Sequence, residues 1–393
     1  MLTLVAPPPP LSAPGQPDGA AAVLRAALTR GPLARSAISK VTGLSPAAVS
    51  RHAADLLAMG LVYEPDTPDG PPRPGRPRIP LDVDTSRHVA AGVHIAIPQL
   101  TYSLTDLRGR VVAMEQAPRR ERPEQVLADI AEQLPRFLAR RGRGRSVLGF
   151  GAVTGGWVDP EAGVLVENAA LGWSDVPLRD RLQRATRLPI HVESHARALA
   201  RAELLFGVAA EHGELVHLFV GNVVDAAIAA GGTLLRGRQG GAGGIAHLPV
   251  PGSTVRCPCG RTGCLQVTVS DRALGDAARA AGVAADLAGL VRAAAAGDAR
   301  ALELCRGRLR AVAHAVGLLV DMISPETLVL TEAVTMYLPE LLGELRAELA
   351  AGAAARVHAS SFGPHALAVA AGAPVLAAVH HDPLALRTAR TAG

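Results

Sequence analysis

Residues 240–266 have the sequence GGAGGIAHLPVPGSTVRCPCGRTGCLQ, which brings one histidine and three cysteines into a short segment rich in turn residues. These residues are His247, Cys257, Cys259 and Cys264. Three thiolates and one imidazole fill a tetrahedral zinc shell and leave no open position for an activated water. We therefore predict one structural zinc ion per chain, bound by a loop over residues 247–264 and without a catalytic role.

Disulfide bonds are the alternative use of these cysteines. The Cys-Pro-Cys spacing of Cys257 and Cys259 is too tight to bridge easily, and Cys305 is the only cysteine outside the segment. The spacing therefore favours metal binding over disulfides or free thiols.

The composition bounds the class of protein. A length of 393 residues suggests two or three domains, and 49% hydrophobic residues suffice for packed cores. Aromatic residues make up only 3%, so these cores are built mostly from Ala, Val and Leu. The net charge of +5 suits a polyanionic partner, although a general preference for arginine gives the same balance.

The first residues carry no targeting signal. Residues 1–19 contain four consecutive prolines at 7–10 and lack a basic start followed by an apolar core. We expect a disordered, proline-rich tail on a cytoplasmic protein, and we find no segment that suggests a membrane span.

Residues 20–60 have the pattern of a helix-turn-helix. Helical spacing of apolar residues covers 20–29, 33–42 and 46–59, with Gly-Pro at 31–32 as a breaker. Before the third helix, Gly-Leu-Ser-Pro at 43–46 supplies a turn, an N-cap serine and a proline at the first helical position. Five basic residues against one acidic residue give this segment a charge of five minus one, +4.

The third of these helices is the one expected to enter a DNA major groove. Its predicted DNA-binding residues are Ser45, Ala47, Ser50, Arg51 and His52. An arginine can bind guanine through two hydrogen bonds, so Arg51 is the candidate base reader; a contact to phosphate is the alternative.

A basic arm follows the helices. Two short extended runs flank a Pro/Gly-rich tip that carries Arg73, Arg76 and Arg78. The sequence Arg-Pro-Gly-Arg-Pro-Arg cannot be helical, and it suits either a narrow minor groove or a solvated linker. Residues 20–82 thus predict a winged helix-turn-helix DNA-binding domain.

From residue 86 the pattern changes to an α/β fold. Predicted strands cover 89–97, 100–107, 111–116, 147–153, 190–193, 216–221 and 226–230. Predicted helices cover 124–140, 177–187 and 195–206, and the last third of the chain is mainly helical, with one long helix over 302–324.

Six motifs follow one another along the chain in this order: GLSPAAVS at 43–50, LLAMGLV at 56–62, GRP at 75–77, VDPEAGV at 158–164, LGWSDVPL at 171–178 and the His/Cys cluster. Together they resemble the ROK family of sugar kinases and sugar-responsive repressors over nearly the whole chain from residue 20. The resemblance implies an actin-like, hexokinase-like body of two α/β lobes over residues 86–390. It also implies a double-stranded DNA operator and a homodimer or homotetramer.

The chain departs from the family's kinases at both phosphate loops. Residues 94–98 are His-Ile-Ala-Ile-Pro where kinases carry Asp-x-Gly-x-Thr, so an acidic residue and a glycine are missing. The second loop, at 221–227, carries Asp225, a negative charge where phosphates would sit. Together these changes disfavour ATP binding.

The sugar-binding residues differ as well. Residues 193–197 are Glu-Ser-His-Ala-Arg where kinases carry Glu-Asn-Asp-Ala-Asn, so His195 replaces the catalytic aspartate. We expect an altered ligand cleft lined by Ser194, His195, Arg197, His247 and Gln266. Arg197 suits an anionic ligand, and a solvated arginine on a helix surface is the alternative.

Three functions remain open. The favoured one is a transcriptional regulator without enzymatic activity, a repressor by resemblance, whose small-molecule effector is carbohydrate-related or anionic. The second is an ATP-dependent sugar kinase with a DNA-binding head, which a coupled nucleotide assay would reveal. The third is a regulator that no longer senses a ligand, in which case no metabolite would alter its affinity for DNA.

Overall fold

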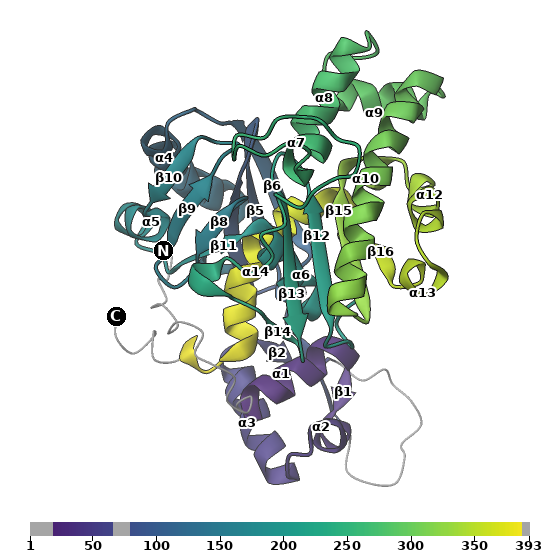
Figure 1. The fold of residues 1–393 in the computed structure, drawn as a ribbon. Helices are drawn as coiled ribbons and strands as arrows, with labels where there is room; N and C mark the ends of the chain where they lie inside the picture. The colour runs from purple at the N-terminus through teal and green to yellow at the C-terminus, as the bar shows by residue number, and fades with distance from the viewer. Residues whose placement is uncertain (1–18, 66–78, 387–393) are drawn as a thin grey trace.

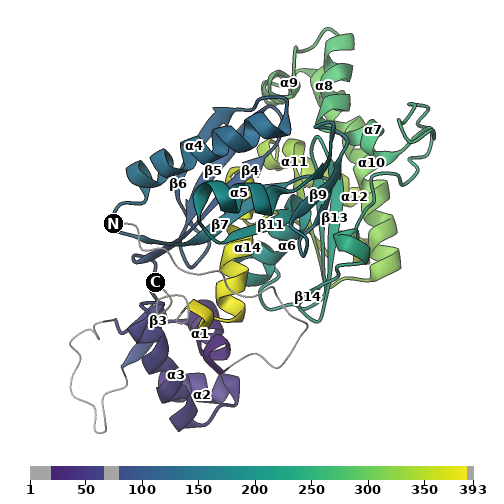
Figure 2. The ribbon, with the colours of Figure 1, turned by 90° about the vertical axis from the view of Figure 1, so that its left-hand side faces the viewer.

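The computed structural model describes residues 19–65 and 79–386. The predicted tail, apart from its last residue, lies outside these ranges, as do Arg73, Arg76 and Arg78 of the predicted arm. The described residues form a small head at one end of a two-lobed α/β body (Figures 1 and 2).

The head is a winged helix-turn-helix, as predicted. Its helices are α1 (Gly19–Arg30), α2 (Arg35–Thr42) and α3 (Pro46–Ala58). Its sheet has the order β1-β3-β2, with β1 (Leu33–Ala34), β3 (Pro80–Val83) and β2 (Val62–Tyr63). The prediction of a helix from residue 33 was wrong by two residues, because Leu33 pairs with Leu81 of β3. That long-range pairing overrides the local helical spacing.

The first lobe is built on a five-stranded sheet of order β11-β7-β4-β5-β6. These strands are β4 (His88–Ile95), β5 (Gln99–Thr105), β6 (Val111–Pro118), β7 (Ser146–Thr154) and β11 (Ile190–Ser194). Their apolar side chains share one core with α4 (Pro123–Arg141) and α5 (Leu178–Thr186). A small sheet of β8 (Trp157–Asp159), β9 (Val164–Asn168) and β10 (Trp173–Val176) adds to this lobe.

The second lobe repeats the plan with the order β14-β13-β12-β15-β16. Its strands are β12 (Leu215–Val220), β13 (Val224–Ala230), β14 (Thr233–Leu234), β15 (Thr327–Glu332) and β16 (Val357–Ala359). Its helices are α7 (Leu265–Val269), α8 (Asp271–Ala280), α9 (Leu287–Ala295), α10 (Ala299–Ile323), α11 (Ala333–Tyr337), α12 (Leu341–Ala347) and α13 (Ala351–Ala354). The sequence analysis did not predict β15, whose six residues are all buried and so lack the alternation that marks a strand, or β16, which spans only three residues.

Two helices fill the layer between the sheets. They are α6 (His195–Phe206) and α14 (Ala366–His381), and α14 crosses the middle of the body (Figure 1). A Cβ at Gly92 or Gly151 would overlap the backbone of Ala371, so these glycines let α14 approach the first sheet closely. Residues 363–381 are long and apolar enough to cross a membrane, but 78% of their most apolar window is buried in the protein.

The head shares a hydrophobic core with the body. Val23 and Leu24 of α1 belong to the same buried cluster as Leu376 and Val379 of α14. Arg108, in the turn between β5 and β6, donates a hydrogen bond to Leu28 O of α1 and forms an ion pair with Asp82 of β3. The orientation of the head is therefore set by packing on the body and not by a linker alone.

Candidate functional site

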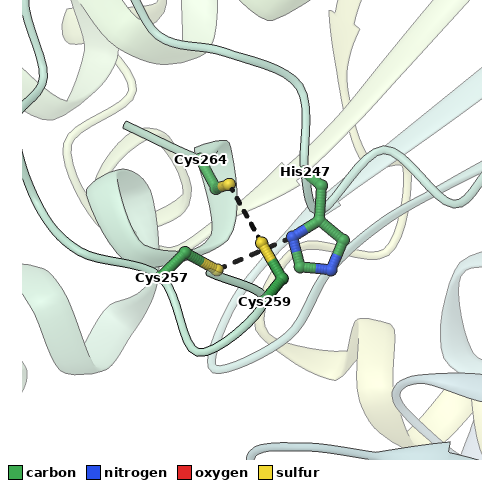
Figure 3. A group of neighbouring side chains, drawn as sticks. All are labelled: His247, Cys257, Cys259 and Cys264. Carbon is green, nitrogen blue, oxygen red and sulfur yellow. Dashed lines mark hydrogen bonds between the residues drawn. The ribbon is translucent and has the colours of Figure 1, made fainter. Parts of the chain in front are cut away.

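The four predicted metal ligands come together in the second lobe (Figure 3), with all their ligand atoms within 4.8 Å of one another. Cys257 Sγ lies 3.6 Å from His247 Nδ1, and Cys259 Sγ lies 3.7 Å from Cys264 Sγ. A tetrahedral zinc ion with bonds of about 2.3 Å to sulfur and about 2.0 Å to nitrogen separates its ligands by about 3.5–3.8 Å. The cluster therefore fits a tetrahedral ion of this size.

Tight turns hold these ligands in place. Cys257 N donates to Arg261 O at 2.8 Å, and Gly260 N donates to Cys257 O at 3.0 Å, which folds the Cys-Pro-Cys-Gly segment back on itself. Gly263 has a φ of +69°, a conformation that a side chain would strain, and Cys264 then stands at the N-cap of α7. The local sequence thus builds most of the cluster.

The cysteines are free thiols, which excludes the disulfide alternative in the described structure. The 3.7 Å between the sulfurs of Cys259 and Cys264 is far beyond the about 2.05 Å of an S–S bond. Cys305 is buried separately in α10. Hydrogen bonds from Arg261 lower the pKa of Cys259 to about 6, which favours the thiolate that binds metals, whereas burial raises the pKa of Cys264 to about 11.

Of the five predicted DNA-binding residues in and before helix α3, four are exposed to solvent. Ser45, Ala47, Ser50 and Arg51 are exposed, while Val49 on the same helix is buried. The Ser45 side chain accepts a hydrogen bond from Ala48 N at 3.2 Å and so caps the helix. Its hydroxyl hydrogen remains available to a phosphate.

His52, the fifth predicted DNA-binding residue, contacts α1 instead of pointing to solvent. Its ring packs against the start of α1, where a Cβ at Gly19 would overlap it, and its Nδ1 is buried. The side chain thus helps to seat α1 on α3. The prediction followed the helical position of His52 alone, without knowledge of which neighbour covers it.

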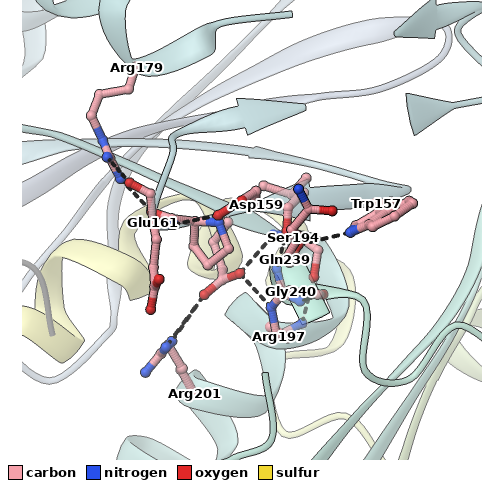
Figure 4. Close-up of polar contacts among 12 residues, drawn as sticks. Trp157, Asp159, Glu161, Arg179, Ser194, Arg197, Arg201, Gln239 and Gly240 are labelled. Carbon is pink, nitrogen blue, oxygen red and sulfur yellow. Dashed lines mark hydrogen bonds and ion pairs between the residues drawn. The ribbon is translucent and has the colours of Figure 1, made fainter. Parts of the chain in front are cut away.

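Arg197 is neither a solvated surface residue nor open to a ligand (Figure 4). Its side chain is 3% exposed, and Nε donates to Glu193 Oε1 at 2.6 Å. The two terminal nitrogens donate to Val158 O, at 2.7 Å, and to Gly240 O. Both alternatives drawn from the sequence were wrong, because Glu193, four residues earlier, and carbonyls from two distant segments enclose the guanidinium.

Ser194 and His195 are also used by the protein itself. The Ser194 hydroxyl caps α6 by accepting from Arg197 N. His195 Nε2 lies 3.3 Å from Asp225 Oδ2, and the same carboxylate oxygen accepts from Gly156 N at 3.0 Å. Asp225 of the second lobe therefore binds the loop after β7 of the first.

The Gln266 side chain forms hydrogen bonds with the backbone of the second loop, at 221–227. Its Oε1 accepts from Val224 N at 2.8 Å, and its Nε2 donates to Asn222 O at 2.7 Å. His247 lies in the metal cluster. Of the five residues predicted to line a ligand cleft, the structure thus engages all five in contacts within the chain.

Further contacts between the lobes were missed by the sequence analysis. Trp157 Nε1 donates to Gln239 O at 2.8 Å, and Arg236 pairs with Glu161. Asn222 Nδ2 donates to Ile97 O at 3.4 Å. No local pattern marks such residues, because each partner lies at least 75 residues away along the chain.

Buried histidines make stability depend on pH, and His94 of the first loop is one of them. Burial, and then the charge of His195, lowers the pKa of His94 to about 3 from 6.5. A pKa lowered by folding stabilises the native state above about pH 6.5, and this contribution is lost as the pH falls toward the folded pKa. At pH 5 the loss from one such histidine is about 2 kcal/mol.

We therefore expect a His94→Gln variant to lose about 2 kcal/mol less stability than the parent chain between pH 7 and pH 5. Urea unfolding at both pH values measures this difference. Asp106 and Glu203, whose pKa values burial raises, act in the opposite direction but are common to both proteins. An unchanged pH dependence in the variant would show that His94 stays accessible to protons in the native state.

Comparison with known proteins agrees with the geometry. A profile of the ROK family matches residues 90–377. The chain is 34% identical over 388 residues to the transcriptional regulator Rv0485 of Mycobacterium tuberculosis, covering 93% of this chain and 87% of that protein. It is 26% identical over 337 residues to the DNA-binding transcriptional dual regulator NagC of Escherichia coli, covering 82% of each.

Solved structures show the same fold. A ROK family transcriptional regulator, described as a homolog of the E. coli MLC protein, superposes with a TM-score of 0.76 at 23% identity, covering 95% of this chain and 98% of that one. A ROK family glucokinase from Streptomyces griseus, in complex with glucose and AMPPNP, has a TM-score of 0.64 at 24% identity and covers 72% and 98%. The chain belongs to the ROK family and is a transcriptional regulator with an N-terminal winged helix-turn-helix.

Proposed function

We propose that this regulator is a cytoplasmic, homo-oligomeric repressor that binds its operator through α3 and has lost the kinase chemistry of its family. Residues 20–82 form the DNA-binding domain, residues 86–390 the sensor domain, and residues 1–19 a tail. The observation that supports the proposal is that Arg197, Asp225 and Gln266, at positions where family kinases carry substrate-binding groups, are engaged in contacts within the chain.

Both loops that bind phosphate in the family's kinases have lost groups needed for that binding. On the first lobe, His94 stands where kinases have an acidic residue, and Pro98 has no amide hydrogen. On the second lobe, the Val224 amide already donates to Gln266, and Asp225 adds a negative charge. A nucleotide would have to displace these contacts and approach a carboxylate, so ATP-dependent activity is disfavoured.

The sugar site has lost its carboxylate base, and Ser194, His195 and Arg197 are buried. His195 contacts Asp225 and lies against the ring of Phe219, with ring centroids 3.8 Å apart and the rings tilted by 32°. Arg197 is 3% exposed, and Nε and both terminal nitrogens already donate to acceptors within the chain, so a ligand hydroxyl or carboxylate would have to displace these contacts. A free hexose needs several paired hydrogen bonds, so the cleft is a poor site for glucose or xylose. This supports an effector of another kind, or none.

Zinc is the proposed cofactor, one ion per chain. The ligand separations described above support it, and the His247 imidazole with the Cys257, Cys259 and Cys264 thiolates would complete its shell. Four protein ligands leave no position for a reacting water, so the ion would stabilise the loop and supply no catalysis. Through α7 and Gln266 the loop also supports the turn before β13.

The DNA-binding role is tested by replacing Arg51 with alanine. We expect operator affinity to fall by about 1–3 kcal/mol, roughly five- to 150-fold, because Arg51 is exposed on the outer face of α3. The measurement is a titration of the full chain with DNA from its own promoter region at several salt concentrations. Loss confined to one guanine indicates a base contact; uniform loss with a salt slope smaller by about one indicates a phosphate contact.

The control is Arg272→Ala, which removes the same charge from an 84% exposed side chain on α8, at the end of the body away from the head (Figure 1). It should leave DNA affinity unchanged. Equal losses in both variants, or binding without sequence preference to every promoter fragment, would contradict recognition by α3.

A further inference from the structure

A pocket of about 580 Å³ lies where the DNA-binding head meets the body. Leu28 and Thr29 at the end of α1 form one side, and the other sides come from the β5–β6 turn, the end of α6 and the start of α14. We propose that this pocket binds a medium-chain monocarboxylate, with octanoate as the representative, and that the bound ligand shifts the position of the head. The regulatory half of this inference rests on the proposed DNA-binding function, whereas the binding half does not.

Apolar side chains form part of the pocket's lining. They are Leu28, Val111, Leu205, Phe206, Phe362 and Val369. Aliphatic and aromatic walls offer few hydrogen-bonding groups to the hydroxyls of a sugar, but they bury the methylenes of an alkyl chain at about 0.8 kcal/mol each. A volume of about 580 Å³ lies within the usual range for small-molecule sites and accommodates a chain of eight carbons.

The charged groups of the pocket favour an anion. Arg108, Arg110 and His365 line it together with one acid, Glu211. The Arg108 guanidinium already donates to Leu28 O and pairs with Asp82, so it is less available to a ligand. Arg110 is exposed, and its guanidinium makes no hydrogen bond within residues 19–65 and 79–386. The nearby Asp106 acts on it only through its charge, so Arg110 is the group that can take up a carboxylate.

Hydrogen bonds within the protein fix one wall of the pocket. Glu203 of α6 is buried and accepts hydrogen bonds from Ser361 Oγ at 2.6 Å and from Ser361 N at 2.9 Å. Val208 N donates to the same hydroxyl at 3.0 Å. These bonds fix Ser361 and the adjoining Phe362 without a ligand, which lowers the entropic cost of binding.

The same residues connect the pocket to the head. Leu28 lines the pocket with its side chain and accepts a hydrogen bond from Arg108 with its carbonyl. A ligand seated between α1 and the β5–β6 turn therefore contacts both sides of the joint. It will favour the head position in which both contacts exist, by no more than its difference in affinity for the two positions.

The test is calorimetric titration of the full chain with octanoate, and with octanamide as a neutral ligand of equal length. We expect saturable binding of octanoate and at least tenfold weaker binding of octanamide. Arg110→Ala should weaken octanoate binding about tenfold, and Arg110→Lys should restore part of the loss. Thr29→Trp, at an exposed position, should fill the pocket from the head side and abolish binding. Arg136→Ala, which removes an exposed arginine from α4, should have no effect.

Absence of saturable octanoate binding to the parent chain overturns the site. So does binding that Arg110→Ala and Thr29→Trp leave unchanged, because octanoate would then sit elsewhere on the protein. If octanoate binds as expected but does not alter affinity for promoter DNA, the coupling to the head is wrong. A chain that binds no DNA at all would overturn the proposed function, while the calorimetry would still decide the site.

Discussion

A Cys264→Ser variant is expected to lose its metal and to unfold the 247–264 loop while the winged helix-turn-helix stays folded. Cys264 is 1% exposed, and its sulfur completes the cluster beside that of Cys259. Structural zinc contributes folding energy directly, and loss of a few kcal/mol lowers the melting temperature of a large domain by about 10 °C. Because Cys264 also begins α7, the turn held by Gln266 should loosen next.

The measurement is the zinc content per chain together with calorimetric melting before and after chelation. Cys305→Ser is the matched control, since it removes a buried thiol that lies outside the cluster. The control should keep one zinc per chain, although burying a hydroxyl lowers its stability. Full zinc occupancy in Cys264→Ser, or a melting temperature of the body unchanged by chelation, would refute the structural role of the ion.

The clustering of the four predicted metal ligands could be predicted from the sequence because its geometry is local. All four ligands fall within residues 247–264, and turns close that loop through short-range bonds such as that between Cys257 and Arg261. The helix-turn-helix was predictable for the same reason: the N-cap at Ser45 and the glycine turn at Gly43 depend on adjacent residues. Ligand type and spacing are enough to predict such a metal site without knowledge of the tertiary fold.

The contacts of the predicted cleft residues could not be predicted from the sequence, because they join residues that lie far apart along the chain. Arg197 meets Gly240 and Val158, which lie 43 and 39 residues away along the chain. Its position in a helix after a strand was predicted correctly, but the direction of its side chain depends on how the small sheet of the first lobe docks. The same limit applies to His52, whose neighbour at Gly19 begins another helix.

Replacing Glu193 by alanine is expected to destabilise the body by about 3–5 kcal/mol, because it leaves the Arg197 guanidinium buried without a counter-charge. The Glu193 side chain is 3% exposed and pairs with Arg197 at 2.6 Å and with Arg201 at 3.4 Å. Burial alone would raise the pKa of Glu193, but the charges of Arg197 and Arg201 lower it overall. The carboxylate is thus ionised in the native state and neutralises a charge that cannot reach water.

Urea unfolding of the body measures this loss, and Glu115→Ala is the matched control. Glu115 also pairs with two arginines, Arg140 and Arg141, but at the surface, where such pairs contribute about 0–1 kcal/mol. A similar small loss in both variants would show that water reaches Arg197 and that the cleft opens in solution.

The double variant Glu193→Leu, Arg197→Leu separates the two causes of destabilisation. It removes the buried charge together with its partner, so it should regain most of the stability that Glu193→Ala loses. The contacts of Arg197 with Val158 and Gly240 are lost as well, and with them a tie between the first lobe and the loop after β14. A recovered melting temperature with altered DNA affinity would therefore assign Arg197 to the relative position of the lobes, whereas unaltered DNA affinity would assign it to stability alone.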